Sequence, residues 1–269
     1  MGLEYTSEKN TEYVKCLLER FRIEYERNDR SGVYGYTQRT MAYNSNRLEG
    51  STLTVEQTAT LFDTQTLSAD GEIIRSKDIE EMTGHFLMFN HMLKTLEEPL
   101  SEELIKKFHY YLKVGVFEDM ANGYPCGEYK NRVNTVSDIK VAHPSEVSDK
   151  MCEFIAEYNA KKEHSIEDLA VMHAAYESIH PFQDGNGRTG RIIVYRECLK
   201  NELIPLIIHD ENKAEYQKNL HILQTKGYKD GLCNYFYKEQ KDYYDKTFEM
   251  IEPCISKEII QSLHKGNRR

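Results

Sequence analysis

The sequence predicts an all-α protein that carries a single β-hairpin. Apolar residues recur at helical spacing through most of the 269 residues. Prolines, glycines and capping side chains mark most of the expected helix ends. Residues 123–145 depart from this pattern, because two short β-prone runs flank a Ser137–Asp138 turn, which is typical of a hairpin.

Composition narrows the class of protein. A chain of 269 residues can bury a substantial core as one large or two small domains. The formal net charge is −9, which argues against a nucleic-acid partner, since nucleic acids need a basic face. Six cysteines without a C-x-x-C pair indicate reduced thiols in a cytoplasmic protein. The longest apolar run, 203–208, is too short to span a membrane, and no signal peptide is apparent.

We expect helices throughout the chain, and we group them in three regions of one compact unit. Before the hairpin, helices are expected at 8–28, 34–48, 55–63, 78–96 and from a cap at Ser101 as far as Val116. After it, they are expected at 144–159, 165–180, 186–199, 212–225 and 232–250, with 259–264 closing the chain. The three regions are 1–100, 101–205 and 206–269.

Two of these helices bracket the most informative stretch, residues 180–191, which reads His-Pro-Phe-Gln-Asp-Gly-Asn-Gly-Arg-Thr-Gly-Arg. Pro181 ends the first helix, because the residue before a proline avoids the α region. The loop 184–187 then leads directly into the second helix. Free N–H groups and the positive end of the helix dipole make a helix N-terminus an anion site. Glycines in the loop allow the backbone to curl around the anion.

The side chains of this stretch indicate the kind of anion. Arg188 and Arg191 are three residues apart, so they share one face of the helix and suit a polyphosphate. Asp184 can hold Mg²⁺, and His180 can act as a base for an incoming hydroxyl. Together they predict nucleotidyl or phosphoryl transfer. Taken singly, each has an ordinary structural explanation as a turn, a capping histidine or a solvated arginine.

The stretch resembles the signature of the Fic family, His-x-Phe-x-(Asp/Glu)-Gly-Asn-Gly-Arg-x-x-Arg, at every fixed position. The resemblance extends over about residues 35–225 and implies a Fic-type helical bundle with a hairpin flap near the active site. It also implies transfer of AMP from Mg-ATP to a Tyr, Thr or Ser hydroxyl of a target protein, the chain itself included. The roles that it implies are His180 as base, Phe182 as loop anchor, Asp184 as Mg²⁺ ligand, Gly185, Asn186, Gly187 and Arg188 as binders of the α- and β-phosphates, and Arg191 as binder of the γ-phosphate.

A second motif lies at the end of the second expected helix, from Ser45 to Gly50. Gly50 fits the C′ position of a helix, and capping alone explains the string. The string also resembles the family's inhibitory motif, (Ser/Thr)-x-x-x-Glu-(Gly/Asn). That resemblance implies that Glu49 pairs with Arg191 and occupies the place of the γ-phosphate.

The resemblance also suggests where the target and the base bind. The hairpin near 131–145 corresponds to the flap, which docks a target segment by strand addition. The helix 212–225 would flank the nucleotide base, which makes Tyr216 and Leu220 candidate adenine contacts. Ordinary core packing explains these two residues equally well.

Several alternatives stay open. The chain could remove AMP, with Glu49 positioning a water, or it could be a nucleotide-binding regulator without turnover. The phosphate-transferring branch of the family has a lysine where this chain has Gly187, which argues against a kinase. The remaining histidines, His209 among them, form no H-x₃-H pair, so we expect no structural zinc. The sequence leaves a homo-oligomer open.

Overall fold

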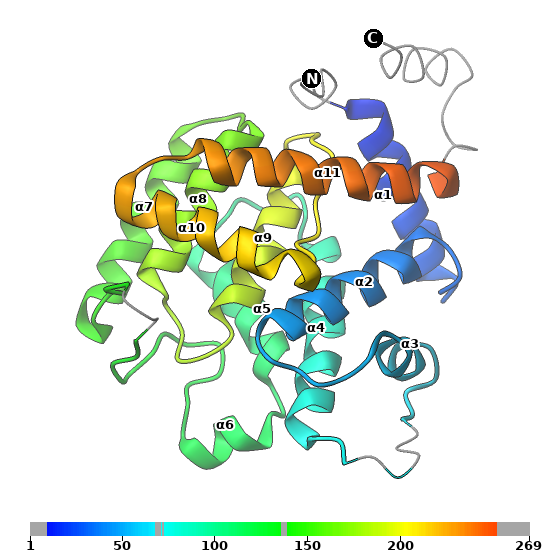
Figure 1. Ribbon diagram of the computed structural model, residues 1–269, viewed down its shortest axis with the longest axis horizontal. Helices are drawn as coiled ribbons and strands as arrows, with labels where there is room; N and C mark the ends of the chain where they lie inside the picture. The colour runs from blue at the N-terminus through cyan, green and yellow to red at the C-terminus, as the bar shows by residue number, and fades with distance from the viewer. Residues whose placement is uncertain (1–9, 68–70, 72, 136–138, 252–269) are drawn as a thin grey trace.

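The structure, a computed structural model, describes residues 10–67, 71, 73–135 and 139–251. The described chain is helical, as Figure 1 shows. Its α-helices are α1 (Thr11–Glu26), α2 (Val33–Leu48), α3 (Val55–Thr64), α4 (Ser76–Lys94), α5 (Glu102–Lys113), α6 (Phe117–Asn122), α7 (Val147–Ala160), α8 (Ile166–Ile179), α9 (Asn186–Lys200), α10 (Lys213–Lys226) and α11 (Asp230–Ile251). Two short 3₁₀ turns, η1 (Pro144–Glu146) and η2 (Asp210–Asn212), precede α7 and α10.

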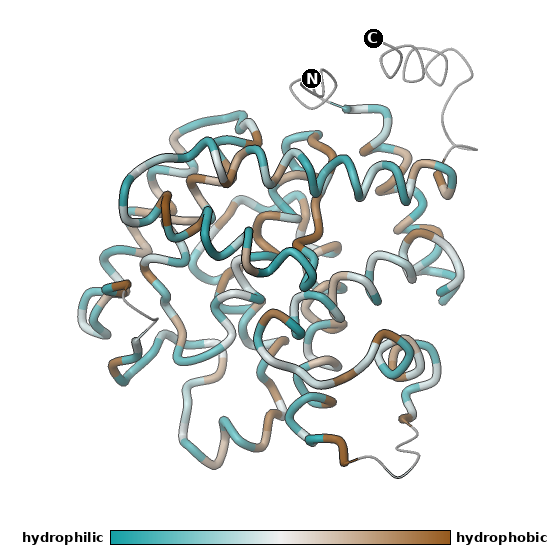
Figure 2. Tube along the Cα trace, in the orientation of Figure 1, coloured by the Kyte–Doolittle hydropathy of each residue, from teal (hydrophilic) through white to brown (hydrophobic). Residues whose placement is uncertain are grey.

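Helix α9 lies at the centre of the molecule. It packs against α8, α5, α4 and α2, and nearly all of its residues are buried. Helix α11 crosses α8, α10 and α1 on the outside, and Figure 2 shows hydrophilic and hydrophobic residues alternating along it. This alternation is expected for a helix with one buried face. The buried apolar residues join in one cluster that draws on all three predicted regions, whose boundaries stay a prediction.

The expected helix ends around the signature are confirmed. The Ser165 side chain accepts a hydrogen bond from the Asp168 N–H, and the Asp168 carboxylate accepts one from the Ser165 N–H. At the other end of α8, His180 adopts the left-handed region with φ 51° just before Pro181. Gly50 follows α2 with φ 90°, a conformation that favours glycine.

One expected helix was wrong in extent. The helix capped by Ser101 ends at Lys113, because Gly115 turns the chain with φ 89°. Val116 then leads into α6, a six-residue helix that the sequence did not predict. Phe117 and Met120 of α6 are exposed, so its apolar residues do not face the core and leave no periodic signal.

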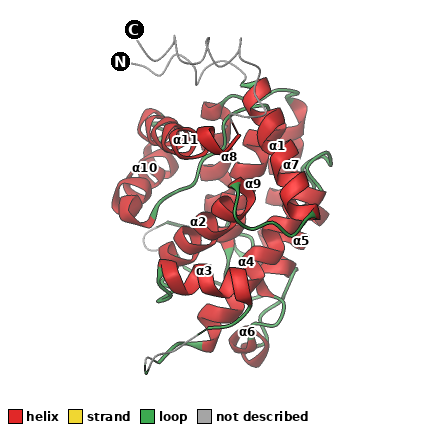
Figure 3. Ribbon diagram, turned by 90° about the vertical axis from the view of Figure 1, so that its right-hand side faces the viewer, coloured by secondary structure: helices red, strands yellow, loops and turns green. Residues whose placement is uncertain are grey.

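The predicted hairpin is not formed in the described residues. Residues 131–135 and 140–143 are irregular, and Ile139 alone is assigned as a bridge residue. Figure 3 accordingly draws helices joined by loops. A short exposed run of β-prone residues is not stable as a strand without a packed partner, which accounts for the irregular backbone of these described residues. The expected turn at Ser137–Asp138 and the closing segment 259–264 lie outside the described residues.

Among the described helices, none combines the length and the apolar character that crossing a membrane requires.

Candidate active site

Phe182 anchors the signature loop in the core. Its ring is fully buried and stacks on His109 of α5, with ring centroids 3.9 Å apart and planes within 4°. The Gly127 N–H donates to Nδ1 of His109, so Nε2 of His109 carries the proton and donates to the Asp184 carbonyl at 3.0 Å. Burial lowers the pKa of His109 to about 3, which keeps the ring neutral. The sequence predicted the anchor but not the histidine beneath it.

The Asn186 side chain is turned into the loop. Its Oδ1 accepts a hydrogen bond from the Phe182 N–H at 2.8 Å, and its Nδ2 donates to the Phe182 carbonyl at 2.9 Å. The amide therefore closes the loop. A phosphate at this site can meet the backbone N–H of Asn186 but not its buried side chain.

Arg188 lies in a buried network of charges. Its guanidinium is 2.6 Å from Oε2 of Glu81 on α4 and donates to Asn46 Oδ1 at 3.1 Å. Lys113, at the end of α5, is buried beside it and contacts Glu81 at 2.5 Å and Asp119 at 2.6 Å. Each buried cation thus has a carboxylate partner, as burial of charge requires.

Asp184 is the exposed member of this network. Its Oδ1 accepts from the Gly185 N–H at 2.7 Å, and its Oδ2 is 2.8 Å from Lys113 Nζ. Burial opposes ionisation, yet the charges of Arg188 and Lys113 hold the pKa of Asp184 far below its ordinary value. About a third of the side chain, 35%, is exposed. An ionised, accessible carboxylate with further lone pairs fits a Mg²⁺ ligand.

Arg191 is paired with the end of α2. Its Nη2 is 2.7 Å from Glu49 Oε1, and its Nε donates to Ser45 Oγ at 2.9 Å. The Glu49 carboxylate lies over Gly187, so close that a Cβ at 187 would collide with Oε1. Burial opposes ionisation of Glu49, but the charges of Arg191 and Arg188 lower its pKa. An ionised carboxylate of the chain therefore fills space at the N-terminus of α9.

Three contacts hold the end of α2 in this position. Lys213 donates to the Leu48 carbonyl at 2.7 Å, and the Asp210 N–H donates to Asn44 Oδ1 at 2.9 Å. Arg75 donates to the Gly50 carbonyl at 2.6 Å. Glu49 is thus supported from the α10 side and from the start of α4.

His180 faces two amide groups. Its Nδ1 is 3.1 Å from Nδ2 of Asn134 and 3.1 Å from Nδ2 of Asn186. Burial, followed by the charge of Lys130, lowers the pKa of His180 to about 4, so the ring is neutral near pH 7. Asn134 was not singled out from the sequence, because nothing in its neighbours marks it.

The candidate adenine contacts lie on α10. Tyr216 is 4% exposed, and its hydroxyl is 2.6 Å from Nε2 of His173. Leu220 is partly buried against the core. Both positions are compatible with packing, and contact with adenine stays a prediction.

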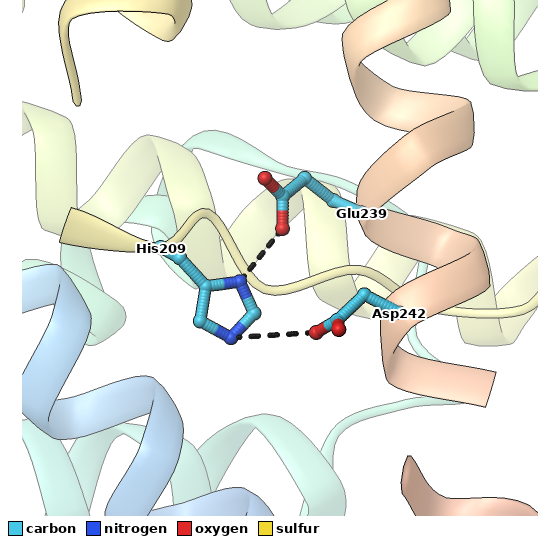
Figure 4. Close-up of side chains that lie close together, drawn as sticks. All are labelled: His209, Glu239 and Asp242. Carbon is cyan, nitrogen blue, oxygen red and sulfur yellow. Dashed lines mark hydrogen bonds and ion pairs between the residues drawn. The ribbon is translucent and has the colours of Figure 1, made fainter. Parts of the chain in front are cut away.

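Figure 4 shows a second group of side chains with metal-ligating chemistry, none of which belongs to the signature loop. His209, just before η2, is 2.7 Å through Nδ1 from Glu239 and 3.6 Å through Nε2 from Asp242, both on α11. Each carboxylate also has another partner, since Asn212 donates to Glu239 at 2.9 Å and Lys246 is 2.8 Å from Asp242. The group joins η2 to α11. The sequence did not predict it, because its members are far apart in the chain.

The described residues define a class of protein: a helical protein whose central helix begins at a glycine-rich loop that follows a histidine. Residues 99–197 match the model of the Fic/DOC family. The chain is 25% identical over 183 residues to a protein adenylyltransferase Fic of Nematostella vectensis, across 66% of this chain and 41% of that protein. It is 24% identical over 190 residues to protein adenylyltransferase fic-1 of Caenorhabditis briggsae, across 67% and 35%. The matches therefore span less than half of these relatives' length.

Solved structures show the same fold. A Fic domain containing signaling protein from Bacteroides thetaiotaomicron superposes with a TM-score of 0.73 at 24% identity, covering 92% of this chain and 99% of that one. Fic-1 from C. elegans superposes with a TM-score of 0.70 at 20% identity, covering 91% and 72%. The first of these covers nearly the whole of both chains, so the likeness extends well beyond residues 99–197.

Proposed function

We propose that the chain is a protein adenylyltransferase, which transfers AMP from ATP to a hydroxyl of a target protein and is held in check by Glu49. The observation that carries this proposal is the carboxylate of Glu49, which pairs with Arg191 at 2.7 Å over the N-terminus of α9. A site built for an anion is here filled by an anion of the chain itself. The names of the relatives support the activity.

In the proposed reaction the hydroxyl oxygen attacks the α-phosphorus of ATP. The new O–P bond forms as the bond to the β-phosphate oxygen breaks, pyrophosphate leaves, and His180 takes the hydroxyl proton. The backbone N–H groups of Asn186 and Gly187 and the guanidinium of Arg188 stabilise the phosphate charge, and Arg191 binds the γ-phosphate. The Gly185 N–H is already donated to Asp184 Oδ1, so Gly185 contributes through the left-handed turn of the loop. Mg²⁺, held by Asp184, would neutralise further phosphate charge.

Inhibition follows from competition for Arg191. While Glu49 holds this guanidinium, the γ-phosphate lacks its partner and the α-phosphate is misaligned for attack. Loss of one charge clamp and of alignment costs about 3–4 kcal/mol, or a few hundredfold in rate. We propose that the target docks near residues 131–145, as the flap of the family does.

The experiment uses ATP labelled separately at the α- and γ-phosphates, with Mg²⁺ and the native protein, Glu49→Gly, or Glu49→Gly with His180→Ala. We expect protein label from α-labelled ATP only, raised by Glu49→Gly and lost with His180→Ala. Label from γ-labelled ATP alone would make the chain a kinase. Absence of label in all three proteins, with cell lysate added as target, together with retained ATP binding, would favour a nucleotide-binding regulator.

Removal of AMP is a second candidate, because Glu49 is ionised and about a third of its side chain, 33%, is exposed. A carboxylate in this state can orient a water beside the loop. The two activities depend on Glu49 in opposite ways. A target that already carries AMP should lose it with the native protein and keep it with Glu49→Gly if removal is the activity.

A further inference from the structure

Asn134 lies between a buried lysine and the imidazole of His180. Its Oδ1 accepts a hydrogen bond from Lys130 Nζ at 2.8 Å, and its Nδ2 is 3.1 Å from His180 Nδ1. Lys130 is itself fixed, because its side chain is buried and its N–H donates to the Pro181 carbonyl at 2.9 Å. Neither residue belongs to the signature.

The orientation of the Asn134 amide follows from partners other than His180. Lys130 has only hydrogens to donate as an ammonium, so the amide oxygen must face it. The amide nitrogen then donates to the Phe182 carbonyl at 3.1 Å, which needs a donor. Asn186 is fixed in the same way, since its oxygen accepts from the Phe182 N–H and its nitrogen donates to the Phe182 carbonyl.

Two N–H donors therefore converge on Nδ1 of His180. A ring nitrogen approached by donors must offer its lone pair, so the proton of the neutral ring lies on Nε2. With the proton there, the ring cannot accept a second proton at Nε2. A base that works through Nε2 needs the opposite tautomer, with the proton on Nδ1 and an acceptor beside it.

We propose that Asn134, held by Lys130, is a positioning residue that keeps His180 in the tautomer protonated at Nε2 and so restrains proton abstraction. The effect on catalysis rests on the proposed function, whereas the hydrogen bonds around His180 do not depend on it. The site then has two restraints, Glu49 on the phosphate side and Asn134 on the base side.

The test reads the tautomer directly by ¹⁵N NMR of the full chain with ¹⁵N-labelled histidine, with His180→Gln to assign the resonances. The key variant is Asn134→Asp, which has the same shape but presents an acceptor to Nδ1 and keeps a partner for Lys130. Asn131→Asp is the matched control, because it adds the same charge at an exposed position of the same segment. Asn186 keeps the Phe182 carbonyl as an acceptor in every variant.

We expect the proton on Nε2 in the native protein and in Asn131→Asp, and on Nδ1 in Asn134→Asp. Lys130→Met, which leaves the Asn134 amide oriented by the Phe182 carbonyl alone, should raise the fraction of His180 with the proton on Nδ1. A native protein with the proton on Nδ1, or an Asn134→Asp spectrum equal to that of Asn131→Asp, overturns the proposal. A native protein with the proton on Nδ1 overturns the proposal even if a variant fails to fold.

The consequence for activity is measured separately. Added to Glu49→Gly, Asn134→Asp should raise AMP transfer about tenfold, a part of the 10²–10⁴ that a well-placed acid or base contributes. If AMP transfer does not increase, Asn134 does not restrain catalysis, and that part of the proposal fails. If Glu49→Gly alone transfers no AMP, the proposed function fails while the tautomer result still stands or falls on the spectra.

Discussion

Arg188 and Arg191 are neighbours on α9, yet their surroundings differ in kind. Arg188 is 2% exposed and is paired with Glu81, itself buried and shared with Lys113. Arg191 is also buried, but its carboxylate partner Glu49 is a third exposed and lies at the end of a helix. One pair is closed inside the protein, and the other opens to solvent.

This difference suggests two roles: we call Arg188–Glu81 the scaffold pair, because it is buried, and Arg191–Glu49 the switch pair, because it can open to solvent. A buried ion pair that loses one member leaves an uncompensated charge, so it cannot be exchanged at low cost. A partly exposed pair at a helix end can open, because water solvates both groups when they part. On the proposed function, Arg188 keeps Glu81 throughout the reaction, while Arg191 exchanges Glu49 for the γ-phosphate.

The largest expected effect is on the scaffold pair. Glu81→Ala leaves Arg188 and Lys113 with one carboxylate fewer in a buried place, and we expect a loss of about 3–5 kcal/mol in the free energy of unfolding. Urea denaturation of the two proteins measures it. Glu80→Ala, on the same helix but partly exposed, removes only the acceptor of the Phe117 N–H and should cost less than about 1 kcal/mol. Equal losses at 80 and 81 would show that the network is not the scaffold.

The second largest effect is expected from the hydrogen bond between Arg191 and Ser45. Ser45→Ala leaves the buried Nε of Arg191 without its acceptor, which should cost about 1–2 kcal/mol of stability. It should also raise AMP transfer, though less than Glu49→Gly does. Ser51→Ala is the control, because its hydroxyl accepts only a 3.4 Å contact from the Leu53 N–H. A Ser45→Ala protein with native stability and native transfer rate would contradict the comparison.

A smaller effect is expected from the support of α2. Lys213→Met removes the ammonium that binds the Leu48 carbonyl and should weaken the inhibited state by about 1 kcal/mol. Basal AMP transfer should then rise about fivefold. Lys218→Met, exposed on the same helix, should leave the rate unchanged. The measurement is label transfer from α-labelled ATP, and a rise with both variants would point to a general charge effect.

The smallest effect concerns pH. The pKa of His180 is lowered to about 4 by burial and by the charge of Lys130, and a base acts only when neutral. The rate of Glu49→Gly should therefore show no loss from this group between pH 8 and 6, and should fall only as pH drops towards about 4. Removing the Lys130 charge with Lys130→Met should move this acid limb to higher pH. If the acid limb of the pH–rate profile does not move, burial alone lowers the pKa of His180.

Local sequence determined much of this protein. Apolar spacing predicted most of the helices, since helix periodicity is a property of neighbouring residues. Pro181, Ser165 and Gly50 marked helix ends, because their effects act within one turn. The signature loop is contiguous, so its position between two helices and the place of His180 at the end of α8 could be predicted.

The tertiary structure alone decided the partners of those residues. Glu81, Lys113 and Asn134 look like ordinary helix or loop residues in the sequence, and only packing brings them to the loop. The described residues 131–135 and 140–143 form no strand for the same reason, since a strand needs a partner that local propensity does not supply. Charge, tautomer and exchange of partners depend on contacts between distant segments, and these contacts are set by how the helices pack around α9.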